Sequence, residues 1–405
     1  MARLDHDWLL KAMANCRPSL PEPFDLAAPT DLQPEDESVL RAFYGSEKRF
    51  ERARAEYRLV RAITQHLACD LEFARIWRGL ICTEWLAHLR LEGHINQGFY
   101  RDHIFHPAAV AMLGWELLHA DPDVLREPAT ATLEGQLAKA YHLDPAQNQT
   151  WTAVLEHAWL VAGLFHDHGC PSETLAKCAA DIKDQNPFFS VDVLQPFRQK
   201  ARELWKANCL DQQTLAHLRP QLKDSKHCHA ALSALALYSL KSDAPNDFAR
   251  AVLDVAGDAV MWHHSVKNYH WQRARHFQFA DHPVRYLLVL CDGLHEFCRE
   301  MAIRREQNDG EFVTSFRESC THAELDLSGV ELGIEYHVNC TAPACAGDGR
   351  WKLARFANGL RKVQKFLNRC GPLRINCRIN HTDCVTCPVG NGVACTCGPD
   401  LCDHG

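Results

Sequence analysis

The residues of this 405-residue chain that are best suited to chemistry are His166 and Asp167, in the segment HDHG at 166–169. Adjacent histidine and aspartate side chains offer a metal ion one neutral nitrogen and one carboxylate from a single point of the backbone. The carboxylate can also bridge a second ion. A lone His-Asp pair is weakly specific, because such pairs also occur as helix C-caps. Its interpretation therefore depends on whether other ligand-competent residues can reach it.

Four further apolar helical stretches carry residues of that kind. They contain His106 in RDHIFHPAAVAMLG, His229 before AALSALALYSL, His263 and His264 in AVMWHHSVK, and Asp292 in RYLLVLCDGLHEF. A carboxylate such as Asp292 is costly to bury unless it is paired or bound to a cation. Each residue alone could be a hydrogen-bonded core or cap residue. Their recurrence in four apolar helices favours one shared metal site.

The order His, His-Asp, His, His, Asp resembles the two-metal form of the HD superfamily of metal-dependent phosphohydrolases. The segment LVAGLFHDHGCP is similar to the family's apolar helix that ends in HDxG. HCHAALSALAL and YLLVLCDGLHEF are similar to its histidine-then-Ser-Ala helix and to its last apolar run before an aspartate. The likeness spans roughly residues 95–305 and implies a helical bundle in which these side chains converge.

The resemblance also implies a ligand set. One ion would be held by four residues: His106, His166, Asp167 and Asp292. Asp167 would bridge to a second ion held by His229 and His263, and His264 competes with His263 for that place. A mixed histidine and carboxylate site suits Mn²⁺, Mg²⁺, Co²⁺ or Fe²⁺, so the occupant of one or two such positions stays open.

The chemistry that follows is hydrolysis of a phosphoester, with a nucleotide-like small molecule as the implied substrate. A metal-activated water attacks phosphorus, and the ions neutralise the charge that develops on the phosphoryl oxygens. In this scheme Asp167 holds the nucleophile in line, and His264 or His168 protonates the leaving group. His103 is assigned to a supporting or substrate-binding role, because it lies three residues before His106.

One feature departs from the family pattern. Many HD enzymes have a lysine at or just after the end of the HDxG segment, whereas Cys170 and Pro171 follow Gly169 here. The missing phosphate-facing cation has substitutes near ligand positions in the sequence: Lys226, Lys267, Arg101 or Arg275. Each of these could equally be a solvated surface cation.

Two other functions compete with hydrolysis. Some HD proteins use six such ligands to bind two irons and activate O₂ on a small polar substrate, and the segment HHSVKNYHW at 263–271 is loosely similar to that of myo-inositol oxygenase. The absence of the phosphate-binding lysine favours this alternative. The bundle could also be a non-catalytic nucleotide-sensing module, but such a module has no need to keep buried carboxylates.

The C-terminal tail holds a second concentration of potential ligands. Seven of the nineteen cysteines lie in the last 36 residues. Cys384 and Cys387 form a CxxC pair, and Cys395 and Cys397 follow it. Thiolates at this spacing fit one corner of a structural zinc site. A flexible tail with surface thiols is the equally weighted alternative.

The elements that must position the central residues are mainly helices. Apolar periodicity predicts helices near residues 103–119, 150–165, 196–208, 211–218, 228–241, 246–262 and 283–305. Thr150 or Asn148 is the expected N-cap of the second of these. Residues 330–338 and 373–379 alternate as strands do, and residues 351–369 form a basic amphipathic helix between them.

These patterns predict a mainly α protein. It would comprise an N-terminal helical extension (1–95), an HD metal-binding bundle (96–305), a small α/β appendage (310–380) and a Cys-rich tail (381–405). The composition is that of an ordinary globular protein, with 46% hydrophobic and 23% charged residues. A net charge of −7 gives no reason to expect a nucleic-acid partner. Without a signal peptide or an apolar membrane span, we expect a cytoplasmic protein with no membrane partner, and an oligomer is left open.

Overall fold

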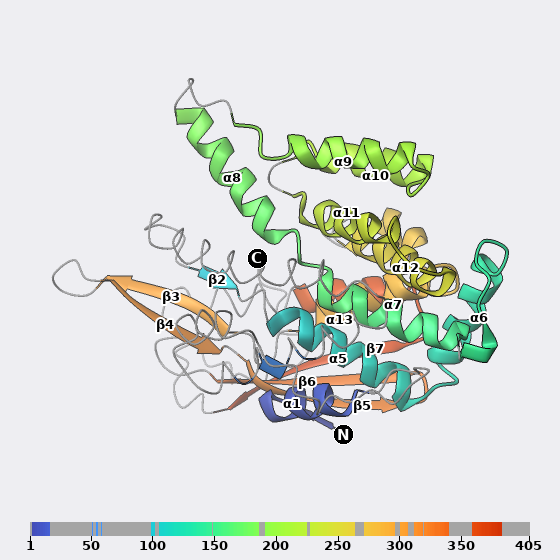
Figure 1. Cartoon of the computed structure of the whole chain (residues 1–405). Helices are drawn as coiled ribbons and strands as arrows, with labels where there is room; N and C mark the ends of the chain where they lie inside the picture. The colour runs from blue at the N-terminus through green and yellow to red at the C-terminus, as the bar shows by residue number, and fades with distance from the viewer. Residues whose placement is uncertain are drawn as a thin grey trace.

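The structure is a computed structural model. It describes residues 2–16, 51, 54–55, 58, 99–101, 105–147, 149–185, 191–224, 227–263, 271–295, 300–306, 312–318, 320–339 and 359–382. Within these ranges the chain is mainly helical, with a small mixed sheet formed largely by its C-terminal part (Figure 1). The predicted fold class is thereby confirmed. In the described part of the chain, no helix combines the length and apolar character needed to cross a membrane.

Five helices form the centre of the bundle and carry the residues of interest. They are α5 (Phe105–Ala120), α7 (Trp151–Phe165), α11 (His229–Lys241), α12 (Asp247–His263) and α13 (Pro283–Leu294). Around them lie α6 (Arg126–Leu137), α8 (Cys170–Gln185), α9 (Gln195–Lys206) and α10 (Gln212–Gln221). The short 3-10 helices η1 (Pro145–Gln147) and η3 (Trp271–Phe277) connect them. The predicted helices at 196–208, 211–218, 228–241 and 246–262 correspond closely to α9, α10, α11 and α12.

Helix α7 runs through the middle of the bundle, and its sequence explains why. The Thr150 hydroxyl accepts a hydrogen bond from the Ala153 amide at 3.1 Å, so Thr150 is the predicted N-cap. From Ala153 to Phe165 every residue is buried. A helix with so few polar residues has to be enclosed by other elements. Helices α5, α6, α12 and α13 enclose it and thereby fix its C-terminal end inside the protein.

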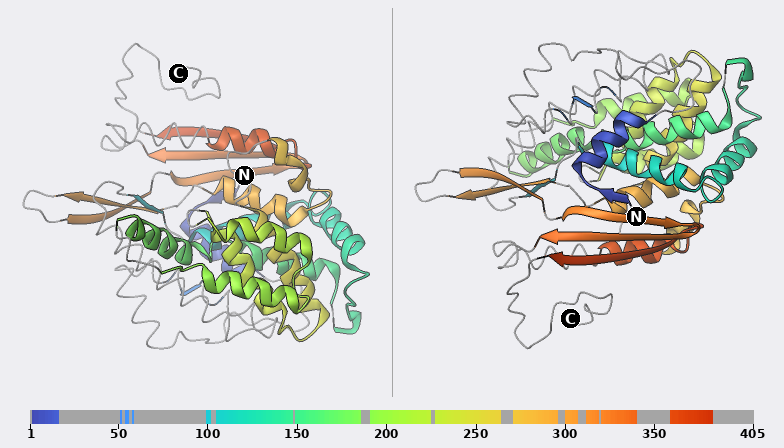
Figure 2. Two further views of the ribbon diagram at one scale, coloured as in Figure 1. Left: turned by 90° about the horizontal axis from the view of Figure 1, so that it is seen from above. Right: turned by 90° about the horizontal axis from the view of Figure 1, so that it is seen from below.

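The sheet has the order β1 (Ala2–Leu4), β5 (Cys320–Ser328), β6 (Glu331–Asn339) and β7 (Arg374–Thr382). Strands β6 and β7 are parallel, and residues 359–367 form a helix between them in sequence. Leu332, Ile334 and Tyr336 are buried on the face of β6 that meets the helices, and the Tyr336 hydroxyl donates to the Leu294 carbonyl at 2.6 Å. The sheet therefore lies along one side of the bundle (Figure 2) and continues its core.

The N-terminus takes part in this arrangement. Strand β1 pairs with β5, and α1 (His6–Asn15) packs against α5. The structure describes too little of residues 16–98 to test the helices that the sequence predicts there. The predicted domain limits stay a prediction.

The helix predicted at 283–305 is wrong in its second half. Helix α13 ends at Leu294, where His295 adopts an extended backbone, and residues Glu300–Glu306 form strand β3. This strand pairs antiparallel with β2 (Phe99–Arg101) and with β4 (Phe312–Glu318), and the β3–β4 hairpin extends outward in Figure 1. Glu, Met, Ala and Arg favour helices in isolation, but pairing with two strands overrides that preference.

Close contact between α5 and α7 sets the distance between the residues at their ends, and it depends on Gly163. A Cβ atom at this position would lie 2.7 Å from the Ala111 Cα atom. We expect Gly163→Ala to lower the free energy of unfolding by about 1–3 kcal/mol, because the backbones must separate. Urea denaturation measures this change.

Gly135→Ala is the matched control, because a Cβ atom there meets nothing within 4 Å. Alanine favours the helix over glycine, so this control should stabilise the protein by about 1 kcal/mol or less. Equal effects of the two substitutions would show that the α5–α7 contact is not tight.

Candidate metal centre

Five helix ends bring the predicted ligands together inside the bundle. His106 lies in the first turn of α5, and His229 is the first residue of α11. His166 caps the C-terminus of α7 and Asp167 follows it. The remaining two ligands, His263 and Asp292, lie at or near the C-terminal ends of α12 and α13. Long-range packing therefore joins residues that are up to 186 positions apart in the sequence.

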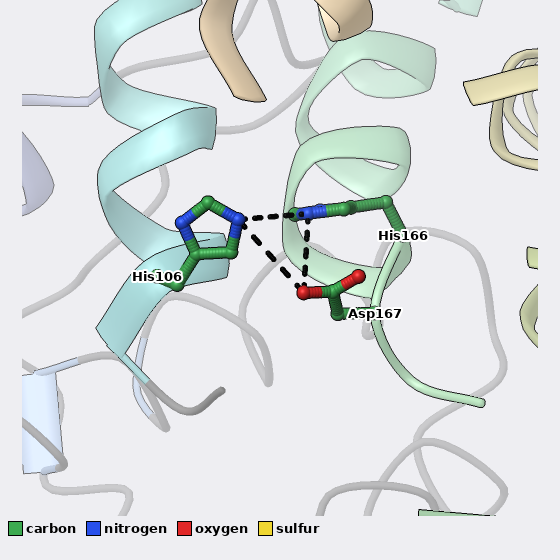
Figure 3. Close-up of side chains that lie close together, drawn as sticks. All are labelled: His106, His166 and Asp167. Carbon is green, nitrogen blue, oxygen red and sulfur yellow. Dashed lines mark hydrogen bonds and ion pairs between the residues drawn. The ribbon is translucent and has the colours of Figure 1, made fainter. Parts of the chain in front are cut away.

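One half of the cluster surrounds His106, as Figure 3 shows in part. Its Nε2 atom lies 2.9 Å from Asp292 Oδ1, 3.3 Å from His166 Nε2 and 3.8 Å from Asp167 Oδ2. His166 Nε2 lies 3.6 Å from the same Asp167 oxygen. Separations of about 3–4 Å are those of atoms that share one ion, because metal–ligand bonds are about 2.0–2.2 Å long. His106, His166 and Asp167 therefore form a group that could hold a metal ion.

The other half faces the second oxygen of Asp167. Its Oδ1 atom lies 3.8 Å from both His229 Nε2 and His263 Nε2. Each oxygen of the carboxylate is thus directed at a different pair of histidines. A carboxylate between two sets of nitrogen ligands is the arrangement that a bridged pair of ions requires.

The orientation of two histidine rings is fixed by the backbone of their own helices. His166 Nδ1 donates to the Gly163 carbonyl at 2.9 Å, and His263 Nδ1 donates to the Val260 carbonyl at 2.6 Å. A carbonyl can only accept, so the neutral ring carries its proton on Nδ1 and presents the lone pair of Nε2 to the cluster. Both rings are thereby prepared to bind a cation.

His229 is oriented by Glu173, which the sequence interpretation missed. The Glu173 Oε2 atom accepts from the His229 backbone amide at 2.7 Å and lies 2.9 Å from His229 Nδ1, while Lys177 pairs with the other oxygen. Burial would raise the pKa of Glu173, but the hydrogen bonds and charges of His229 and Lys177 lower it to about 2. A carboxylate behind a ligand histidine is a common device for fixing the ring and increasing its basicity.

His295 plays the corresponding part for His106 and was also missed. The two Nδ1 atoms are 2.7 Å apart, so one of them donates to the other. His295 lies three residues after Asp292 and directly follows the last residue of α13. That spacing, and the position of Glu173 four residues after Gly169, are the signals in the sequence that could have identified both residues.

Electrostatics hold the central carboxylates in their charged form. Burial would raise the pKa of Asp167, but His166, His263, His106 and His229 lower it well below the ordinary value. The pKa of Asp292 is lowered in the same way, mainly by the hydrogen bond and charge of His106, against the effect of burial. Burial also lowers the pKa of His166, which favours the neutral ring that binds metals.

Exposure is uneven across the cluster. The His166 side chain is 0% exposed, that of Asp167 is 12% exposed and that of Asp292 is 35% exposed. Solvent therefore reaches the cluster mainly on the Asp292 side, within the part of the chain that the structure describes.

The structure describes only some of the other residues that the sequence assigns to the site. His168 is next to the cluster in sequence, packs edge-on against Phe165, and has its pKa lowered to about 4 by burial. The Nε atom of the exposed Arg275 donates to the His276 ring at 3.2 Å. The remaining assigned residues lie outside the described residues: His103, His264, Lys226, Lys267, Cys384, Cys387, Cys395 and Cys397. The side chain of Arg101 is likewise not described.

A second group with metal-ligand chemistry, formed by His322, Glu324 and His337, lies on the outer face of β5 and β6. Its two imidazole rings stack at 4.2 Å with planes only 5° apart. Lone pairs in parallel planes do not converge on one point, whereas the rings of His106 and His166 are inclined at 71°. The bundle cluster is therefore the stronger candidate for a metal site.

The comparisons with known proteins identify no relative of this chain. No protein-family model, curated protein or solved structure matches the chain. The similarity to the HD superfamily thus depends on the residue pattern and on the buried cluster of histidines and Asp167.

Removal of the carboxylate behind His229 tests the metal centre. We expect Glu173→Gln to weaken metal binding about 10- to 100-fold, because the amide neither charges nor fixes the ring as the carboxylate does. Competition with a chromophoric chelator measures the affinity. Glu203→Gln, at an exposed position of α9, should bind as the wild type does. Equal affinities for the two variants would contradict the assignment.

Glu173→Gln also tests how the free energy of unfolding depends on pH. The folded-state pKa of Glu173, about 2, lies below the ordinary value of 4.5, so its charged form stabilises the fold above pH 4.5. This stabilisation is lost as the pH falls from 4.5 towards 2. The difference in free energy of unfolding between the metal-free wild type and Glu173→Gln should therefore shrink over that window in urea titrations. A difference that is independent of pH would count against the buried Glu173–His229 pair.

Proposed function

We propose that the protein is a metal-dependent phosphohydrolase that cleaves a nucleotide-like phosphoester with a metal-activated water. One ion would be held by His106, His166, Asp167 and Asp292. The other would be held by Asp167, His229 and His263. When bound, such ions activate water and neutralise the charge that develops on phosphoryl oxygens.

The observation that carries this proposal is the position of Asp167. Its two oxygens face two separate histidine pairs, with Nε2 atoms 3.6 and 3.8 Å from Oδ2 and 3.8 Å from Oδ1. Four imidazoles around one carboxylate give a donor set with nitrogen and oxygen ligands on both sides. This donor set fits divalent transition metals better than Ca²⁺, which prefers oxygen ligands alone.

The protein's own residues would supply position and proton transfer. Asp167 would hold the nucleophile in line, and Glu173 and His295 would keep the rings of His229 and His106 in place. A substrate would approach from the accessible Asp292 side. Burial lowers the pKa of His168 to about 4, so near pH 7 its ring lacks the proton that a general acid must donate. We therefore favour His264 for protonation of the leaving group.

A di-iron oxygenase is the second candidate. Cys170 follows Gly169 at the place where many HD phosphohydrolases have a lysine for phosphate, and six ligands are nevertheless present. The same donor set can bind two irons. Elemental analysis and O₂ consumption in the presence of small polar substrates separate this candidate from a hydrolase.

The test is Asp167→Asn, which keeps the size of the side chain but leaves it one oxygen and no charge. We expect at least about a 10³-fold loss of activity on a panel of phosphomonoesters, phosphodiesters and nucleotides with Mn²⁺ or Co²⁺. The bound metal should fall in parallel. Asp243→Asn, at an exposed loop position, is the control and should keep both.

Two results would contradict the proposal. One is hydrolysis that persists in Asp167→Asn. The other is a wild-type protein that binds two ions and cleaves none of the phosphoesters, in which case O₂ consumption would favour the oxygenase.

A further inference from the structure

Cys170 lies beside the histidine cluster on the His229 side. Its Sγ atom, an oxygen of Asp167 and a ring nitrogen of His229 are all within 4.8 Å of one another. The residue is half-buried, in contrast to the fully buried Cys228 and Cys291. In the sequence, Cys170 follows Gly169 where many HD enzymes have a lysine, and this position alone does not indicate that its thiol is a potential ligand.

The backbone explains why the thiol is held there. The Cys170 amide donates to the Asp167 carbonyl at 2.9 Å, so the chain turns tightly between the two side chains. Gly169, within this turn, lies directly against α11. A Cβ atom at Gly169 would be 2.1 Å from the His229 carbonyl oxygen, and the Gly169 amide donates to Ser233 Oγ at 2.7 Å. The turn is thus fixed to the helix that begins with His229.

The two sides of Asp167 therefore differ in their donor atoms. The His106 side offers nitrogen and oxygen atoms from His106, His166 and Asp292. The His229 side offers nitrogen atoms and, from Cys170, a sulfur atom. Thiolates favour Zn²⁺, Fe²⁺ and Co²⁺ over Mg²⁺ and Mn²⁺, whereas nitrogen and oxygen donors discriminate less.

We propose that Cys170 is a ligand of the ion on the His229 side, which makes the two metal positions unequal and selects a thiophilic ion for one of them. The inference rests on the proposed two-metal function. On binding, a sulfur–metal bond forms and the thiol proton is released to solvent.

Cobalt spectroscopy tests this ligand directly. The parent is the full chain with Cys384, Cys387, Cys395, Cys397 and Cys402 changed to serine, so that the thiols of the tail at 381–405 do not contribute. Metal-free parent protein is titrated with Co²⁺ under anaerobic conditions. We expect two Co²⁺ per chain and a near-ultraviolet sulfur-to-cobalt charge-transfer band that accompanies one of them.

Two variants of the parent identify the thiol. Cys170→Ser should lose the charge-transfer band. It should still bind two Co²⁺, but the ion on the His229 side should bind more weakly. Cys178→Ser, which removes another half-buried thiol of α8, should keep the band unchanged. Circular dichroism compares the folding of the two variants, and Cys170→Asp, which restores a charged ligand, should bind both ions without the band.

The outcomes separate this inference from the proposed function. Two Co²⁺ bound without a charge-transfer band, or a band that persists in Cys170→Ser, would overturn Cys170 as a ligand and leave the metal centre intact. Co²⁺ binding that Asp167→Ala does not reduce would overturn the metal centre and the inference together.

Discussion

A carboxylate in the interior of a helical bundle needs partners of opposite charge or hydrogen-bond donors, because its desolvation costs several kcal/mol. Asp167 is surrounded by four imidazoles, two on each side of its carboxylate. Neutral imidazoles whose Nδ1 atoms are already engaged with carbonyls offer it lone pairs rather than protons. Cations between the carboxylate and these rings would bind both the carboxylate oxygens and the imidazole lone pairs. A metal centre therefore accounts for the cluster better than a network of hydrogen bonds.

The rest of the bundle can be understood from that centre. Helix α7 is buried from Ala153 to Phe165, so its C-terminal end lies inside the protein. Helices α5, α11, α12 and α13 each bring one potential ligand from at or near a helix end. Close contacts at Gly163 and Gly169 set how near α5 and α11 come to the segment 163–169. Glu173 and His295 then contact the Nδ1 atoms of His229 and His106 and fix the orientation of these two rings. Rigid elements position the ligands, as a preorganised site requires.

Much of this could be predicted from the sequence, and the exceptions have physical reasons. The strongly apolar helix α7, the amphipathic helix α12 and the Thr150 cap were predictable because the signals are local. The convergence of His106, His166, Asp167, His229 and His263 agrees with the predicted set. The strand at Glu300–Glu306 was not predictable, because its pairing with β2 and β4 is tertiary. Glu173 and Cys170 were missed because they come near His229 only through the packing of α8 beside α11. That packing depends on the turn at Gly169.

The most direct measurement of the central claim is a crystal structure of the protein soaked with Co²⁺ under anaerobic conditions, with anomalous scattering recorded at the cobalt edge. The account predicts two anomalous peaks, about 3.5–4 Å apart, on opposite sides of the Asp167 carboxylate. One peak would lie among His106, His166 and Asp292, and the other beside His229 and His263. No peak next to Asp167, or a single peak on the outer face of β5 and β6, would contradict it.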